Sequence, residues 1–179
     1  MAILMTARGD SERAWEELYR SHGRSVLAAA TLAAGGNRHE AWDGVQHAFT
    51  EAWIRLMKPD SLTVDNWPGW LRQVAVRHVV RHRQHQNRTE SLEGLDCPQA
   101  MPPLDTQLVL KEEYQDTLKV VAQMHPRRRQ ALALHLIAGY STAETARIME
   151  VEESSVRSLV RLARGSFPNR KQEGGADHG

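Results

Sequence analysis

The sequence predicts an all-α protein of two small helical domains joined by a flexible acidic linker. Apolar residues recur at helical spacing along most of the chain, and no segment alternates apolar and polar residues as a strand does. A proline-rich stretch between residues 89 and 106 interrupts this periodicity. Near the C-terminus, two short helical segments flank a tight turn, which is the pattern of a helix-turn-helix.

Composition narrows the classes of protein that the chain can belong to. It has 179 residues, with 23 Lys and Arg against 22 Asp and Glu, so only the distribution of charge can indicate nucleic-acid binding. A single cysteine, Cys97, excludes an internal disulfide and suits the reducing cytoplasm, where we expect the protein. No apolar run is long enough for a membrane span or a signal peptide. Either Met1 or Met5 fits as the start.

The first domain is expected over residues 10–88. Its predicted helices cover residues 11–34, 39–57 and 70–86. Gly35-Gly36 ends the first of them, and Pro59 closes the second.

The third of these helices, with the residues that flank it, is strongly basic. Residues 67–89 contain no acid and carry these cations and histidines: Arg72, Arg77, His78, Arg81, His82, Arg83, His85 and Arg88. Basic side chains beside aromatic rings suit single-stranded or melting nucleic acid. Trp67 and Trp70 stand at the start of the helix; for Trp70 we favour a place in the core, and for Trp67 both interpretations stay open.

A metal site on this helix is not expected. His78 and His82 are four residues apart and could share one face, but the glutamate of a zinc-protease helix is missing and the neighbouring arginines repel a dication. We favour a phosphate-facing surface, and we predict no metal and no cofactor.

Residues 89–106 are expected to form the mobile linker, because they combine three prolines with four acids. The second domain is expected over residues 107–168, where helical spacing resumes. Pro126 opens a helix in the position that proline tolerates best, and Gly139 ends that helix. Residues 169–179 are predicted to be a disordered tail.

The helix-turn-helix is expected over residues 141–164. Ser141 and Glu144 have the spacing of a capping box, which marks the start of the first helix. In the second helix, apolar residues recur on one side, while Ser154, Arg157, Ser158, Arg161 and Arg164 fall on the other. Such a stripe is often just a solvated face, but no acid lies between Glu153 and Glu173, and a merely soluble helix mixes both signs. Arginines of this kind can hold phosphates or contact guanine edges in the major groove.

Several motifs, in the same order, resemble the sigma factors of bacterial RNA polymerase, specifically the extracytoplasmic-function group of the sigma-70 family. The resemblance covers about residues 14–167. The motifs that carry it are Trp15-Glu16-Glu17-Leu18-Tyr19, Glu40-Ala41-Trp42-Asp43-Gly44-Val45-Gln46-His47, Trp70-Leu71-Arg72-Gln73, Met124-His125-Pro126-Arg127 and the capped helix-turn-helix. The resemblance implies a transcription initiation factor without catalysis of its own.

The resemblance also implies roles for individual residues. Asp43, Gln46 and His47 would bind the clamp coiled coil of the largest polymerase subunit. The −10 promoter element would be opened and held by Asn66, Trp67, Arg77, His78 and Arg81. The −35 element would be contacted by Ser155, Arg157, Ser158, Arg161 and Arg164. The partners implied are core polymerase, including the flap of its β subunit, and promoter DNA; whether an anti-sigma protein is a further partner stays open.

Some residues depart from the pattern of this family. Arg77 stands where asparagine is usual, Arg81 where aspartate is frequent, and His47 where an acid is common. Glu150 takes the place of the usual turn glycine, at a cost of about 1 kcal/mol if its φ is positive. Glu152 stands where a serine usually caps the recognition helix. These departures leave the resemblance to the family intact and affect which promoter sequence the protein would recognise.

The alternative function is a helix-turn-helix regulator that binds duplex DNA without polymerase.

Overall fold

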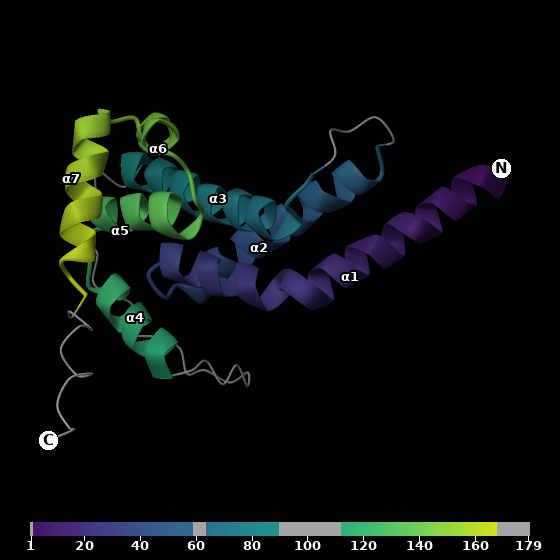
Figure 1. Ribbon diagram of the computed structural model, residues 1–179, viewed down its shortest axis with the longest axis horizontal. Helices are drawn as coiled ribbons and strands as arrows, with labels where there is room; N and C mark the ends of the chain where they lie inside the picture. The colour runs from purple at the N-terminus through teal and green to yellow at the C-terminus, as the bar shows by residue number, and fades with distance from the viewer. Residues whose placement is uncertain (1, 59–63, 90–111, 168–179) are drawn as a thin grey trace, which may run out of the picture.

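The computed structural model describes residues 2–58, 64–89 and 112–167 (Figure 1). Within these residues the chain is helical and contains no strand, which confirms the predicted all-α class. The elements are α1 (Ala2–Ala33), α2 (Arg38–Leu56), α3 (Trp67–Thr89), α4 (Glu112–Ala122), α5 (Pro126–Leu132), the π-helical turn η1 (Ala133–Ile137), α6 (Thr142–Met149) and α7 (Glu153–Arg164). The predicted linker and tail lie outside the described residues, apart from Thr89. No helix in the described part of the chain has the length and apolar character that a membrane crossing requires.

Two of the predicted helix starts are wrong. α1 begins at Ala2 rather than Ser11, because an established helix extends at little cost through good helix formers such as Ala2, Leu4 and Ala7, even with Gly9 among them. α3 begins at Trp67 rather than Trp70. Asn66 precedes it, and its side-chain oxygen accepts a hydrogen bond from the amide of Gly69 at 3.0 Å.

The first three helices pack against one another as one bundle (Figure 1). α1 and α2 are separated by a turn in which Gly35 and Gly36 have φ of 59° and 94°, a conformation that favours glycine. α2 and α3 approach closely at Gly44, where an added Cβ would lie 2.8 Å from a methyl group of Val79.

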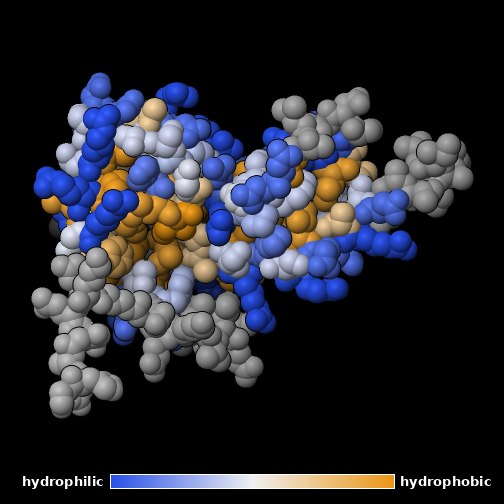
Figure 2. Space-filling view, in the orientation of Figure 1, coloured by the Kyte–Doolittle hydropathy of each residue, from blue (hydrophilic) through white to orange (hydrophobic). Residues whose placement is uncertain are grey.

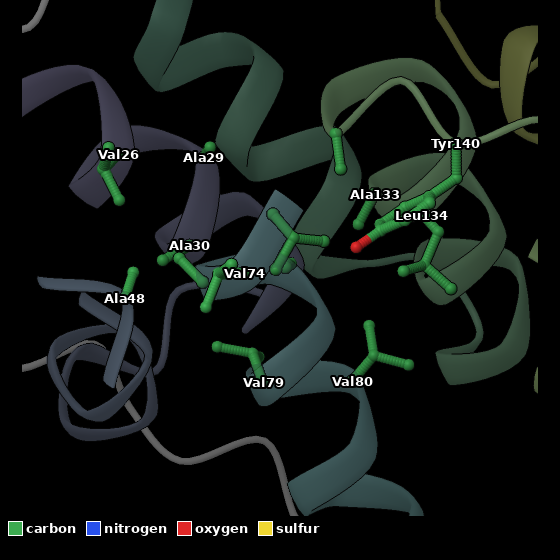
Figure 3. Close-up of a cluster of buried hydrophobic side chains, with 14 of the residues drawn as sticks. Val26, Ala29, Ala30, Ala48, Val74, Val79, Val80, Ala133, Leu134 and Tyr140 are labelled. Carbon is green, nitrogen blue, oxygen red and sulfur yellow. The ribbon is translucent and has the colours of Figure 1, made fainter. Parts of the chain in front are cut away.

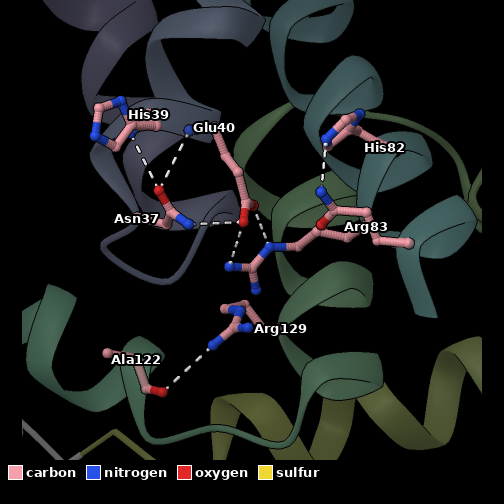
Figure 4. A network of polar contacts seen from close by, with 8 residues as sticks. Asn37, His39, Glu40, His82, Arg83, Ala122 and Arg129 are labelled. Carbon is pink, nitrogen blue, oxygen red and sulfur yellow. Dashed lines mark hydrogen bonds and ion pairs between the residues drawn. The ribbon is translucent and has the colours of Figure 1, made fainter. Parts of the chain in front are cut away.

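A polar network ties the start of α2 to α3 (Figure 4). Asn37 caps α2 by accepting from the amides of His39 and Glu40, and its own amide donates to the Glu40 carboxylate. That carboxylate also pairs with Arg83 of α3, and both side chains are largely withdrawn from solvent. Arg83, one of the cations of the basic helix, therefore has a structural partner within the bundle.

The C-terminal helices follow the predicted local signals. Pro126 is the first residue of α5, and Gly139 has a φ of 81° just after η1. The capping box at the start of α6 is complete, since Ser141 accepts from the amide of Glu144 and Glu144 accepts from that of Ser141. The turn that follows passes through Glu150, whose φ is 55°.

The two sets of helices pack directly against each other. One cluster of buried residues contains Val26 and Val80 from the first set together with Leu134 and Tyr140 from the second (Figure 3). Hydrogen bonds cross the same boundary, from the Tyr140 hydroxyl to the carbonyl of Gln73. Apolar side chains on η1 and α3 that would otherwise face water account for this contact. This packing was not predicted, because the sequence indicates two modules that are connected only by a linker.

Candidate nucleic-acid and protein interfaces

The recognition helix α7 has the predicted two sides. Val156, Val160 and Ala163 are buried against the rest of the domain. The five predicted −35 residues, Ser155, Arg157, Ser158, Arg161 and Arg164, are all exposed. Hydrophilic side chains cover this edge of the molecule in Figure 2.

Arg157 has a partner of its own. Its guanidinium lies 3.0 Å from the carboxylate of Glu153, one turn earlier on α7. Both side chains are well exposed, so the pair contributes little and can open at small cost when a stronger anion approaches. Arg157 is therefore available to a phosphate or a base.

A shallow hollow of 410 Å³ lies beside the start of α7. It is lined by Arg127 of α5, Val151, Ser154, Ser155, Ser158 and Leu159. Arg127 was not among the predicted DNA-binding residues. Sequence spacing could not place it there, because it comes from a helix that precedes the helix-turn-helix.

The predicted −10 residues are spread along α3. Asn66 and Trp67 stand at its N-terminal end, and Arg77 follows roughly 15 Å further along the axis at about 1.5 Å per residue. Arg81 is exposed, while Arg77 and His78 are half-buried. The helix therefore brings Arg77, His78 and Arg81 together and keeps them apart from Asn66 and Trp67.

Two tryptophans and an arginine meet at the start of α3. Trp67 and Trp70 are half-buried and their rings meet edge to face, with centroids 5.5 Å apart. The guanidinium of Arg55 lies 5.0 Å from the centroid of a Trp70 ring. Trp70 packs against the core, as predicted, and Trp67, which was left open, does the same.

The histidines form a short stack between α2 and α3. The rings of His47 and His78 lie 4.3 Å apart, and those of His78 and His82 lie 6.3 Å apart. Burial lowers the pKa of His78, and the neighbouring His47 and His82 lower it further, against the opposing charge of Asp43. Within the described residues no group of three or more His, Cys, Asp or Glu side chains is arranged to hold a metal.

The predicted polymerase-binding residues lie on the outer side of α2. Asp43 and Gln46 are exposed, and His47 is half-buried beside His78. Gln46 also lines an open groove of 730 Å³ between α1 and α2.

Aromatic rings form most of this groove, and two acids of α1 are also part of it. Its lining includes Glu12, Trp15, Glu16, Tyr19, Trp42, Phe49, Thr50 and Trp53. The indole N–H of Trp15 donates to the carbonyl of Phe49 at 2.9 Å, which fixes α1 against α2. The groove could not be predicted from the sequence, because these rings follow the same periodicity as core residues.

Comparison with known proteins decides what the C-terminal helices are. Residues 114–166 match the family model of sigma-70, region 4. This part of the chain is similar to region 4 of the sigma-70 family. The match spans α4 to α7 almost completely, so it includes the cationic face of the recognition helix. It confirms the sigma-70 relationship predicted from the sequence and supports a sigma factor function.

Two solved structures are similar to the chain over a larger part of its length. The structure of CnrH in complex with the cytosolic domain of CnrY has a TM-score of 0.48 and 20% identity, covering 92% of each chain. The sigma factor RpoE in complex with the anti-sigma factor NepR from Bartonella quintana has a TM-score of 0.49 and 20% identity, covering 84% of this chain and 94% of that one. No curated protein sequence matches the chain.

Proposed function

We propose that this protein is a sigma factor, which binds core RNA polymerase and directs promoter recognition and transcription initiation. The observation that carries the proposal is the region 4 match over a helix-turn-helix whose recognition helix exposes a cationic face. On that face Arg157 pairs with Glu153 of the same helix. In this role the protein supplies binding and specificity, and the polymerase supplies the catalysis.

The −35 element is assigned to α7. The exposed arginines Arg157, Arg161 and Arg164 lie on the side of the helix opposite its buried residues, so the helix can enter a major groove without unfolding. Ser155 and Ser158 line the adjoining hollow and can donate to phosphate or base atoms.

The −10 element is assigned to α3 and the residue before it. Arg77 and Arg81 supply cations for the backbone, His78 supplies a polar ring beside them, and Trp67 supplies a ring next to the exposed Asn66. Trp67 is half-buried, so stacking on a base uses only the part of the ring that the core leaves open.

Core polymerase is assigned to α2 and to the aromatic groove beside it. The exposed Asp43 and Gln46 offer polar contacts, and the groove offers apolar surface to a helix of the partner. The half-buried His47 completes the predicted set. For the helices that match region 4 we keep the flap of the β subunit as the predicted contact; an anti-sigma protein as a further partner stays open.

Binding to core polymerase tests the proposal. The labelled chain is titrated with core enzyme that lacks its own specificity subunit, and saturable binding is expected. Gln46→Arg should weaken it, because a long cation would enter the groove, while Gln123→Arg, an exposed position after α4, is the matched control. Absence of binding by the unmodified chain would overturn the proposal.

The alternative regulator makes a different prediction. It requires tight binding of duplex DNA without polymerase, and a dimer, because one helix-turn-helix module rarely binds tightly alone. Gel filtration together with a DNA mobility-shift assay separates the two functions.

A further inference from the structure

Three histidine rings from two helices form one stack at the surface assigned to the −10 element. The ring of His47 on α2 lies 4.3 Å from that of His78 on α3, and the planes of the two rings are 27° apart. The ring of His82, one turn further along α3, lies 6.3 Å from that of His78, with 10° between the planes. His82 is exposed and the other two are half-buried, so the stack runs from the boundary between the helices out to solvent.

Little negative charge compensates the stack from α2. The carboxylate of Asp43 raises the pKa of His78, but burial and the charges of the two neighbouring histidines lower that pKa by more. Glu40, one turn before Asp43, already pairs with Arg83. The middle ring is therefore held neutral at a pH at which an exposed histidine begins to take up a proton.

The other elements around this part of α3 add no acid that favours the protonated stack. Arg77 and Arg81 directly precede the two histidines of α3, and Arg81 is exposed. Towards the C-terminal helices, Tyr140 and Glu144 act together with these two arginines. In the described part of the chain, α1, which also packs on α3, contributes no charge to the shift in the pKa of His78.

The outer ring of the stack has a partner that suits both of its charge states. The amide nitrogen of Gln86 lies 3.0 Å from Nε2 of His82 (Figure 4). In this arrangement the ring nitrogen accepts a hydrogen bond, so the ring is neutral. Half a turn of the amide would present its oxygen to a protonated ring, so the same side chain can stabilise either form.

A phosphodiester backbone carries the negative charge that the stack lacks. Each of its phosphates is an anion throughout the range in which histidine titrates, and a nearby anion favours the imidazolium form. A protonated ring offers two N–H donors, whereas a neutral ring offers one donor and one acceptor. A backbone bound along the stack therefore raises the pKa of its rings and takes up protons from solution.

We propose that His47, His78 and His82 form a proton-linked phosphate-binding site, which holds the backbone of single-stranded DNA on α3 and binds it more tightly as the pH falls. The proposal adds His47 and His82 to the residues assigned to the −10 element. It rests on the proposed function for the identity of the DNA, but proton uptake on binding can be measured without polymerase. Because the bound state holds more protons than the free state, a lower pH favours binding.

The pH dependence of oligonucleotide binding tests the proposal. The full chain is titrated into dye-labelled single-stranded oligo-dT at constant ionic strength, between about pH 8 and about pH 5.5, on either side of the ordinary pKa of histidine. Thymine does not titrate in this range, so a change in affinity reports on the protein. Uptake of one proton changes the dissociation constant about tenfold per pH unit, and we expect it to fall by about tenfold or more over the range.

Glutamine variants assign the proton uptake to the stack, since glutamine keeps a polar side chain that does not titrate. His47→Gln and His82→Gln should each reduce the slope of affinity against pH, and a triple variant that includes His78→Gln should flatten it. His39→Gln, at an exposed position on α2 outside the stack, is the matched control and should keep the slope. His82→Gln is also exposed, so it covers the case in which the triple variant fails to fold.

Proton NMR of the histidine rings gives the second readout. The Cε1 proton of each ring is followed against pH with and without saturating oligo-dT, and the variants assign the resonances. The pKa of His78 should rise when the oligonucleotide is bound, and that of His39 should rise less.

The outcomes separate this inference from the proposed function. Equal slopes in the unmodified chain and in the His82→Gln and triple variants would overturn the inference, as would absence of oligonucleotide binding at every pH. A slope that His39→Gln reduces as much as His47→Gln would assign the proton uptake to the charge of the whole protein and would overturn the site. The titration with core polymerase is made near pH 8, where the stack is neutral. Its failure would count against the proposed function and would leave the proton linkage standing.

Discussion

Glu150 has a left-handed backbone conformation that suits glycine better than glutamate. Glu150 lies in the turn between α6 and α7 and has a φ of 55°. Among the described non-glycine residues no other has a positive φ. The left-handed conformation costs a residue with a Cβ roughly 1–2 kcal/mol. Glycine avoids this cost, but part of the gain is lost because glycine also increases the entropy of the unfolded chain. Glu150→Gly should raise the free energy of unfolding by about 1 kcal/mol in urea titrations. Glu150→Ala keeps the Cβ and should bring no such gain; equal effects of the two changes would contradict this account.

Glu152 precedes α7 without capping it through its side chain. It is the N-cap residue, and no hydrogen bond from its side chain reaches the first turn. Glu152→Ser should supply that bond and raise the free energy of unfolding by about 0.5–1 kcal/mol. Glu153→Gln, which changes the neighbouring acid without offering a cap, is the control. Loss of stability in Glu152→Ser would show that the acid contributes more through the helix dipole than a serine cap does.

His78 should make stability depend on pH. Its pKa in the folded protein is lowered by burial and by His47 and His82, so the unfolded chain takes up its proton at a higher pH than the folded chain. The unfolded state then binds more protons, and stability falls as the pH drops through and below about 6.5. We expect the urea midpoint to decrease between pH 7 and pH 5. The decrease should be smaller in His78→Asn, and an identical pH profile for the two proteins would contradict the assignment.

At the scale of elements, Gly44 sets the distance between α2 and α3. An added Cβ would lie 2.8 Å from Val79 and 3.0 Å from the carbonyl of Ala75, so the helices would have to move apart. Gly44→Ala should lower the free energy of unfolding by about 1–3 kcal/mol. Gly23→Ala is the matched control, since its nearest neighbours are ring atoms of Tyr19 at 3.8 Å and alanine favours the helix there. A stabilising Gly44→Ala would show that the two helices adapt freely.

The recognition helix α7 should lose promoter affinity when its arginines are shortened. Arg157→Ala or Arg161→Ala should weaken binding of a −35 site by about 1–3 kcal/mol if the side chain contacts a base. The measurement is fluorescence anisotropy with the matched promoter and with a scrambled duplex. A uniform loss on both duplexes, accompanied by a smaller salt dependence, would mark the arginine as a phosphate contact instead.

Local signals in the sequence predicted the elements that depend on local interactions. The Ser141–Glu144 capping box, Pro126 at the start of α5 and the glycine turn after α1 all stand where they were expected. Each of these positions is fixed by hydrogen bonds or backbone preferences within a few residues. The sidedness of α7 was predicted for a similar reason, since its apolar residues recur with the helical period.

Features that depend on distant residues could not be predicted in this way. The groove between α1 and α2 needs Trp15 and Trp53 side by side, and nothing in their spacing says that they meet. Arg83 reads as one more cation of a basic helix, whereas Glu40, 43 positions earlier, binds it. Tyr140 follows no periodic pattern, so its contact with α3 appears only in the folded chain.

At the scale of the whole molecule, the helices that match sigma-70 region 4 pack directly against the first three-helix bundle. The matched residues are 114–166, and the η1 turn among them contacts α1 and α3 of that bundle. Under the proposed function, a larger partner that holds both halves raises the affinity for promoter DNA, because the second DNA contact then becomes intramolecular. The domain limits proposed from the sequence, 10–88 and 107–168, remain a prediction in this scheme.

Mapping of transcript starts tests the central claim most directly. Core polymerase without its specificity subunit is incubated with genomic fragments, with and without the purified chain, and the 5′ ends of the transcripts are sequenced. The account predicts starts that depend on the chain and share two conserved elements near −10 and −35. The same pattern of 5′ ends in both reactions would contradict it.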